Sequence, residues 1–188
     1  GGGPEDMTVD SVVEEIDIET GEVLLHWSGL ENIPLHESDM PPQLMSPWDH
    51  LHVNAVSIDD DDNLLITARS NSAVYKVDRN TGEVLWKLGS GASTLVLDVG
   101  VRSNWIHDGQ PAGNNVYRLF DNGANDYFEG YESRVVWIRV DEENKRATFV
   151  KQITHPEHLS AAAEGNSQQL DNGNVMVGWG RAGRISEF

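Results

Sequence analysis

The 188-residue sequence contains no cysteine, which excludes disulfide bonds and thiolate metal sites. It also has no apolar run long enough to cross a membrane and no signal-peptide pattern. Basic residues are scarce, with 13 lysines and arginines against 31 aspartates and glutamates and a net charge of −18. Because this charge repels nucleic acid and anionic lipid, neither is an expected partner. A secreted or extracellular location is predicted; the absence of thiols says little about compartment but permits secretion without a redox constraint.

The sequence is rich in β-strand patterns, most clearly between residues 48 and 88. Four runs of strand-forming residues follow one another there, each ended by turn residues: His50–Ile58, Asn63–Arg69, Ala73–Val77 and Val84–Leu88. Runs so close together in the chain pair as antiparallel neighbours. The sequence therefore predicts a four-stranded meander, which is the size of one β-propeller blade.

Parts of this unit recur elsewhere in the chain. The segment Val12–Leu24 matches Ala73–Leu85, including a shared Asp-x-x-Thr-Gly-Glu turn, and Val135–Asp141 is a weaker copy. Repeats spaced roughly 50 to 65 residues apart fit blades with elaborated loops. The predicted fold is an all-β propeller of four-stranded antiparallel blades, of which this chain covers about three blade-equivalents.

The predicted domain organisation follows from these repeats. Residues 1–10 form a flexible N-terminal segment and residues 11–188 a partial propeller. The propeller divides into the outer half of a blade (11–29), a complete blade (48–90), a further blade (105–154) and the start of another (165–188). Because a propeller closes only when its first and last blades meet, we expect the remaining blades to come from other polypeptide segments.

Polar side chains gather on the predicted innermost strands, which face the axis of a propeller. His50, His52 and Asn54 alternate with apolar residues, so they are expected to share one face of their strand. His107 stands at the matching point of the next blade, and Arg69 ends a strand near the same mouth. Imidazoles, an amide and a guanidinium in an otherwise acidic protein predict an oxyanion site.

Several motifs resemble those of the arylsulfotransferase family, especially its fungal and actinobacterial branch. They are Trp48–Val56, Ala68–Arg69, Val74–Asp78, Leu85–Gly89, His107–Asp108, Leu119–Gly123, Thr154–Pro156, Gly165–Gln168 and Gly173–Gly180. The resemblance implies a six-bladed propeller that moves a sulfuryl group from an aryl sulfate to a phenol through a sulfated histidine, with no cofactor. It makes His107 the nucleophile, His52 and Asn54 the family's His-x-Asn pair, and Arg69 the sulfate-binding arginine.

Neighbouring polar residues have simpler interpretations. Asp108 follows His107 directly and is expected to orient its ring. His155 and His158 lie in a polar connection and are interpreted as solvated side chains rather than metal ligands. The acidic run Asp59–Asp62 is interpreted as a turn rather than a calcium site, because its spacing lacks a ligand pattern.

Two functions of other classes stay open. The run Asp78–Trp86 also looks like the repeat of quinone-dependent dehydrogenase propellers, and the absorbance of a bound quinone would identify that case. The second alternative is a non-catalytic propeller that binds a protein or a glycan on its loop-rich face. Tryptophans in the outer-strand patterns are expected to serve packing: Trp27, Trp86 and Trp137.

Overall fold

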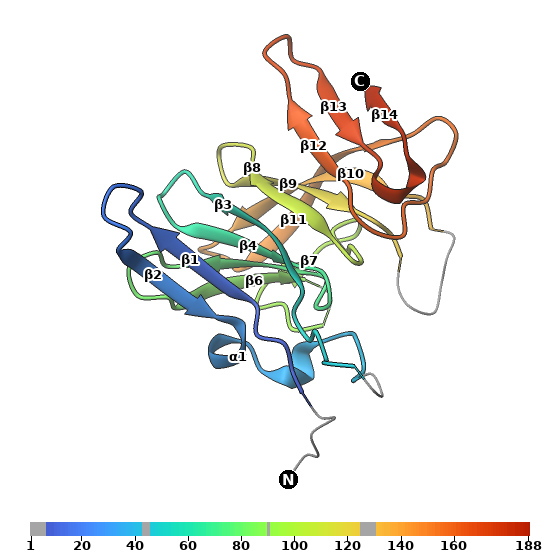
Figure 1. Cartoon of the computed structure of the whole chain (residues 1–188). Coiled ribbons are helices and arrows are strands. Elements are labelled where there is room, and N and C mark those ends of the chain that lie inside the picture. Colours follow the sequence, from blue (N-terminus) through green and yellow to red (C-terminus); the bar gives the residue numbers. More distant parts are fainter. Residues whose placement is uncertain (1–6, 43–45, 90, 125–130) are drawn as a thin grey trace.

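The computed structural model describes residues 7–42, 46–89, 91–124 and 131–188. In these residues the protein is all-β, with antiparallel sheets that follow one another in chain order (Figure 1). The short pairing of β7 (Val96–Leu97) with β11 (Arg146–Thr154) is parallel. The all-β class predicted from the strand pattern is therefore confirmed.

Strands that follow one another in the chain mostly belong to the same sheet. The first sheet pairs β1 (Val12–Ile16) with β2 (Val23–Ser28), and the second has the order β3 (Val53–Ile58), β4 (Leu64–Ala68), β5 (Ala73–Val77) and β6 (Val84–Gly89). The third has the order β7, β11, β10 (Arg134–Asp141), β9 (Val116–Asp121) and β8 (His107–Pro111). The fourth consists of β12 (Asn166–Gln169), β13 (Val175–Gly178) and β14 (Ile185–Glu187).

The helical elements are short turns in the connections. They are α1 (Gly29–Asn32), η1 (Leu35–Glu37) and η2 (Gly180–Ala182). Ser28 caps α1, its hydroxyl oxygen accepting a hydrogen bond from the Glu31 backbone N–H at 3.2 Å. Within the described residues, no helix has the length and apolar character needed to span a bilayer.

The second sheet is the predicted four-stranded meander, but its inner strand begins later than predicted. β3 starts at Val53, because the carboxylate of Asp49 accepts a 2.9 Å hydrogen bond from the backbone N–H of His52. His52 consequently has a left-handed φ of 52°, which interrupts the extended backbone. The predicted alternation from His50 onwards is therefore wrong. His50 is fully buried with its ring edge-on to Trp48, whereas the His52 side chain is 41% exposed.

The Asp-x-x-Thr-Gly-Glu repeat forms the same turn in both places. The Oδ1 atoms of Asp17 and Asp78 each accept hydrogen bonds from the backbone N–H groups two and three residues later. Gly21 and Gly82 then adopt φ values of 73° and 75°, which glycine reaches without a steric penalty. The repeat thus encodes the connection between the last two strands of a sheet.

Neighbouring sheets stack face to face, with a hydrophobic core between each pair. These cores join the first sheet to the second (Val13, Trp27, Leu64, Tyr75), the second to the third (Leu65, Val74, Tyr117, Leu119) and the third to the fourth (Val116, Phe120, Val175, Val177). Because successive side chains of a strand point to opposite faces, β4 and β9 each contribute to two cores, and every residue in both strands is buried. The tryptophans expected to serve packing are at most 4% exposed, which confirms that role: Trp27, Trp86 and Trp137.

Three predicted segments lie partly outside the described residues. They lack residues 1–6 of the N-terminal segment, residue 90 of the complete blade and residues 125–130 of the further blade. Trp48 joins residues 7–9 to the rest of the protein, because its backbone N–H donates to the Met7 carbonyl at 2.7 Å and its carbonyl accepts from the Val9 N–H at 2.9 Å.

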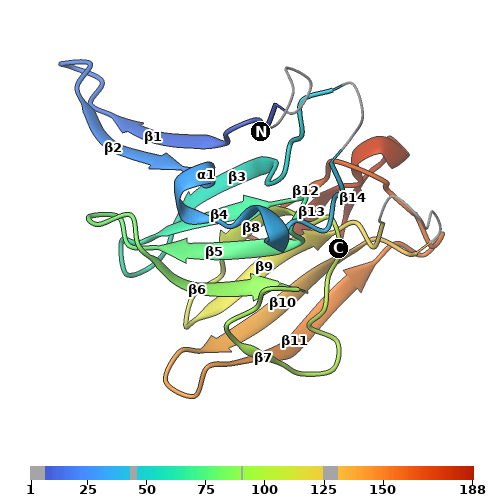
Figure 2. The same cartoon turned by 90° about the horizontal axis from the view of Figure 1, so that it is seen from below.

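The edge strands β3, β8 and β12 of successive sheets are neighbours. β3 lies against β8, and β8 and β9 lie against β12 (Figures 1 and 2). The Ser57 hydroxyl donates to the carbonyl of Gly109 at 2.9 Å, and the Gly109 N–H donates to Thr67 Oγ1 at 3.1 Å. A Cβ on Gly109 would lie 2.3 Å from Thr67 Oγ1, so only glycine permits this approach. The close approach brings polar residues of β3, β4 and β8 into one region.

Candidate functional site

The structure brings His52, Asn54, Arg69 and His107 together where β3, β4 and β8 meet. Asn54 Nδ2 donates a 2.8 Å hydrogen bond to the carbonyl of Ile106, the residue before His107. The backbone N–H of Arg69 donates to the His52 carbonyl at 3.1 Å. Arg69 and His52 lie close enough to the His107 imidazole for their charges to lower its pKa. Residues selected at separate points in the sequence therefore lie around a common site.

A β-bulge turns Asn54 towards this site. Val53 pairs with Ala68 and Ala55 pairs with Thr67, so Asn54 is the extra residue and has no partner across the ladder. A bulged residue leaves the regular alternation of a strand, and bulges often re-aim side chains next to functional sites. The amide of Asn54 can therefore reach β8 of the next sheet.

Arg69 is held by an aromatic ring that sequence reasoning did not select. Its guanidinium carbon lies 3.8 Å from the ring centroid of Trp105. Trp105 is buried, has a left-handed φ of 51°, and donates its backbone N–H to the Ser72 hydroxyl at 3.1 Å. Stacking on a buried ring fixes the plane of the guanidinium, which suits recognition of a planar or tetrahedral oxyanion.

His107 is a half-buried imidazole held through Nδ1. This nitrogen lies 2.7 Å from Asn122 Oδ1 and 3.1 Å from the Trp105 carbonyl oxygen. Burial lowers the pKa of His107, and the nearby Arg69 and His52 lower it further, while the two hydrogen bonds oppose the shift. The His107 ring is therefore neutral at pH 7, which is the protonation state that a nucleophile requires.

The prediction that Asp108 orients His107 is wrong. Asp108 lies in a bulge of β8 with a φ of 55°, which turns its carboxylate away towards the fourth sheet. There its Oδ2 accepts hydrogen bonds from the Ser167 backbone N–H at 2.7 Å and the Ser167 hydroxyl at 3.3 Å. Burial raises the pKa of Asp108. The Asn122 side chain holds the His107 ring instead. In the sequence, Asn122 stood out only as a member of the Leu119–Gly123 motif.

His52 has its own carboxylate partner. Asp49 Oδ2 lies 2.5 Å from His52 Nδ1, and Asp49 Oδ1 accepts from the His52 backbone N–H. One aspartate therefore fixes both the backbone and the ring of this histidine. Asp49 belongs to the Trp48–Val56 motif, but its position three residues before His52 did not by itself predict the contact between the two side chains.

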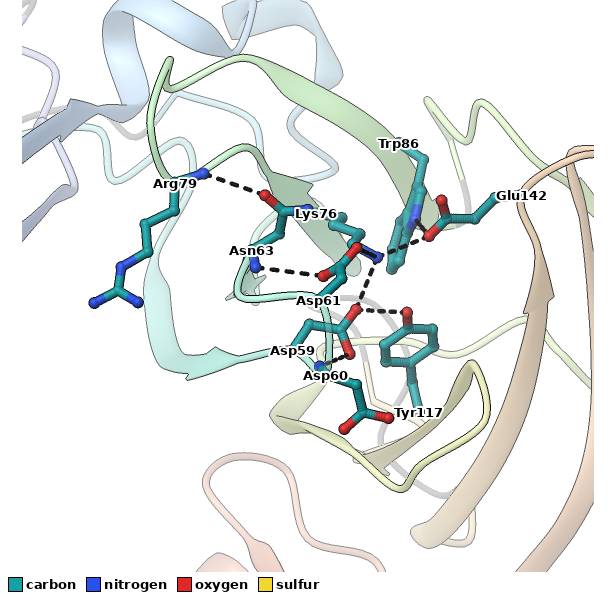
Figure 3. Close-up of polar contacts among 9 residues, drawn as sticks. All are labelled: Asp59, Asp60, Asp61, Asn63, Lys76, Arg79, Trp86, Tyr117 and Glu142. Carbon is teal, nitrogen blue, oxygen red and sulfur yellow. Dashed lines mark hydrogen bonds and ion pairs between the residues drawn. The ribbon is translucent and has the colours of Figure 1, made fainter.

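A second polar cluster, centred on a buried lysine, lies between the second and third sheets (Figure 3). The ammonium group of Lys76, whose side chain is 2% exposed, lies 2.9 Å from Asp59, 2.7 Å from Asp61 and 2.8 Å from Glu142. The Tyr117 hydroxyl also donates to Asp59 at 2.8 Å. Burial alone would lower the pKa of Lys76, but the three carboxylates raise it above its usual value. Two residues of the acidic run Asp59–Asp62, Asp59 and Asp61, therefore belong to a structural ion cluster.

An open pocket of about 390 Å³ lies beside this cluster, and its lining includes Lys76, Arg139 and Glu142. None of the four predicted site residues lines it.

In the described ranges, no group of three histidine or acidic side chains is placed to hold a metal ion. His155 packs edge-on to Trp179, with ring centroids 5.5 Å apart, and the exposed His158 lies 3.3 Å from Glu132.

The described residues form an all-β protein in which His52, Asn54, Arg69 and His107 lie where β3, β4 and β8 meet. The chain belongs to the arylsulfotransferase family, because the family model described as "Arylsulfotransferase (ASST)" matches residues 1–188. A solved structure titled "Structure of U3-55K" is similar with a TM-score of 0.43 and 15% identity, over 94% of this chain and 45% of that chain. The chain thus spans less than half the length of that protein. No curated protein matches the chain significantly.

Proposed function

We propose that this chain carries the sulfuryl-transfer site of an arylsulfotransferase, with His107 as the covalent carrier. The donor is an aryl sulfate and the acceptor a phenol. The observation that carries the proposal is a half-buried imidazole held through Nδ1, with a pKa lowered by burial and by the charge of the nearby stacked Arg69, in a member of this family. The family assignment favours neither the quinone-dependent alternative nor the binding module.

Each residue has a separate role in the proposed reaction. In the first half, the His107 imidazole attacks sulfur, an N–S bond forms and the S–O bond to the aryl group breaks. The departing phenolate takes a proton from His52. In the second half, the acceptor phenol returns a proton to His52 while its oxygen attacks sulfur, and His107 is released. Protons and electrons balance over the cycle, and ping-pong kinetics are expected.

Arg69 and Asn54 are proposed to act on the sulfuryl oxygens. The guanidinium stacked on Trp105 offers fixed donors to these oxygens, and the bulged amide lies between β3 and β8. Fixed donors favour the transition state because they need no reorientation as charge develops. The local geometry is consistent with these roles.

Covalent labelling tests the carrier. Brief incubation of the complete protein with 4-nitrophenyl sulfate should add one sulfuryl group, and peptide mass analysis under mildly alkaline conditions should place it on the fragment with His107. His107→Asn should abolish the label. His158→Asn is the matched control, because this histidine is exposed and should not affect labelling. Label that persists in His107→Asn, or that maps to His52, would overturn the assignment of roles.

We also propose that the sheets are blades of one propeller, six in the complete protein, whose other blades come from other polypeptide segments. Face-to-face stacking and adjacent inner strands support this arrangement. The outer face of β1 and β2 exposes Val12, Ile16 and Leu24, which suits contact with a further blade. Sedimentation of this chain alone should reveal self-association, and a stable compact monomer would count against the proposal.

A further inference from the structure

Asn122 holds its side-chain amide in one orientation. The residue is fully buried just after β9, and its Nδ2 donates hydrogen bonds to the carbonyl oxygens of Ala161 at 2.7 Å and Glu164 at 2.8 Å. A carbonyl oxygen only accepts, so both partners require the NH₂ group of the amide. The two N–H bonds of Asn122 are then both used, and Oδ1 must face His107.

This orientation determines where His107 keeps its proton. An amide oxygen cannot donate, and the second neighbour of His107 Nδ1, the Trp105 carbonyl, cannot donate either. Nδ1 must therefore be the protonated nitrogen. In a neutral imidazole only one nitrogen carries hydrogen, so Nε2 carries the lone pair.

We propose that Asn122 is a positioning residue that keeps His107 in its Nδ1-protonated tautomer and so makes Nε2 the nitrogen that accepts the sulfuryl group. This inference rests on the proposed function. The Nε2 lone pair forms the N–S bond while the aryl S–O bond breaks, and the Nδ1 proton stays in place. The imidazolium-like ring that results keeps its hydrogen bond to Asn122 Oδ1 and becomes a good leaving group for the second half-reaction.

A hydroxyl group supports Asn122 from behind. Ser133 Oγ donates to the Asn122 backbone carbonyl at 2.8 Å and accepts from the Ala161 backbone N–H at 2.8 Å. Ser133 also donates its own backbone N–H to the Leu159 carbonyl at 2.8 Å. Ala161 and Glu164, in the connection between β11 and β12, thus fix the His107 ring indirectly. They bind Asn122 and Ser133, and Asn122 in turn contacts the ring.

Nitrogen NMR of the complete protein, labelled with ¹⁵N in its histidines, measures the tautomer without any need for activity. Wild-type His107 should show a protonated Nδ1 and a bare Nε2. Asn122→Ala should shift both signals towards the opposite tautomer, because the shorter of the two Nδ1 contacts is lost and only the 3.1 Å contact to the Trp105 carbonyl remains. Asn122→Asp keeps an acceptor towards Nδ1 and should keep the wild-type tautomer, as should Ser133→Ala, which removes only the supporting bonds.

A kinetic measurement completes the test. Asn122→Ala should slow sulfation of His107 by 4-nitrophenyl sulfate at least about tenfold, and the Nε2 regioisomer should dominate in the wild type. A wild-type proton on Nε2, or an unchanged tautomer in Asn122→Ala, overturns the inference. The wild-type spectrum alone decides it if that variant fails to fold. If the tautomer is as expected but no sulfation occurs, the positioning role stands and the proposed function fails.

Discussion

Replacing Lys76 by methionine should destabilise the protein by about 3 kcal/mol. The substitution keeps most of the apolar stem and removes the charge that three carboxylates share. Removing one partner of a buried ion pair costs about 3 to 5 kcal/mol, because a buried charge is left uncompensated. Asp61 and Glu142 are 49% and 43% exposed and become hydrated, whereas Asp59 is 6% exposed. With one stranded carboxylate rather than three, the lower end of the range applies.

Urea unfolding followed by tryptophan fluorescence measures this cost, and Trp86 is a suitable reporter because its indole N–H donates to Glu142 at 2.9 Å. Lys151→Met is the matched control: it removes the same charge, but from an exposed side chain 4.4 Å from the Trp137 ring. That change should cost less than about 1 kcal/mol. Adding Asp59→Asn to Lys76→Met should recover at least about half of the lost stability.

The pH dependence of the same variant has a definite sign. Burial would raise the pKa of Asp61, but the hydrogen bonds from Lys76 and Asn63 lower it overall. A lowered carboxyl pKa adds stability that is present above the ordinary value and is lost as pH falls through the lowered one. Wild type should therefore lose more stability on acidification than Lys76→Met. Equal costs for Lys76→Met and Lys151→Met at pH 7 would refute the reasoning.

Three further changes test other parts of the structure. Arg69→Lys keeps the charge but loses the fork stacked on Trp105, so calorimetry should find sulfate binding weakened at least about tenfold with little change in melting temperature; a large loss of stability with unchanged binding would make Arg69 structural. Because burial lowers the pKa of His107, stability should fall as pH drops below the ordinary histidine value of 6.5, and His107→Asn should flatten this slope in urea titrations; an identical slope would contradict the shift. Gly109→Ala should cost about 1 to 3 kcal/mol in urea unfolding, since its Cβ would meet Thr67, and a neutral effect would mean that the strands can separate.

The second sheet could be predicted because its information is local. Alternating apolar residues and turn residues define each strand, and the repeated turn at Asp17 and Asp78 forms its hydrogen bonds within four residues. The start of β3 could not be predicted in this way. The Asp49 side chain captures the His52 backbone N–H there, and that contact competes with an otherwise regular strand pattern.

The proximity of the candidate site residues could be predicted, but their hydrogen-bond partners could not. His52, Asn54, Arg69 and His107 come together as expected from matching positions in successive repeats. The partner of the His107 ring depends on a bulge that rotates Asp108 away and on Asn122 at the end of another strand. A strand pattern gives the face of a residue only while the register is regular, so bulges remove the basis of the prediction.

The shared cores between successive sheets give the protein a nearest-neighbour cooperativity. β4 and β9 each stabilise two interfaces, so loosening one sheet removes a core of the sheet next to it and leaves the cores beyond intact. Amide protection should therefore be graded along the stack, greatest in the second and third sheets and least in β1–β2 and β12–β14. The candidate histidine–arginine site lies between the second and third sheets, which are expected to be the best protected, so fraying should disturb its geometry least.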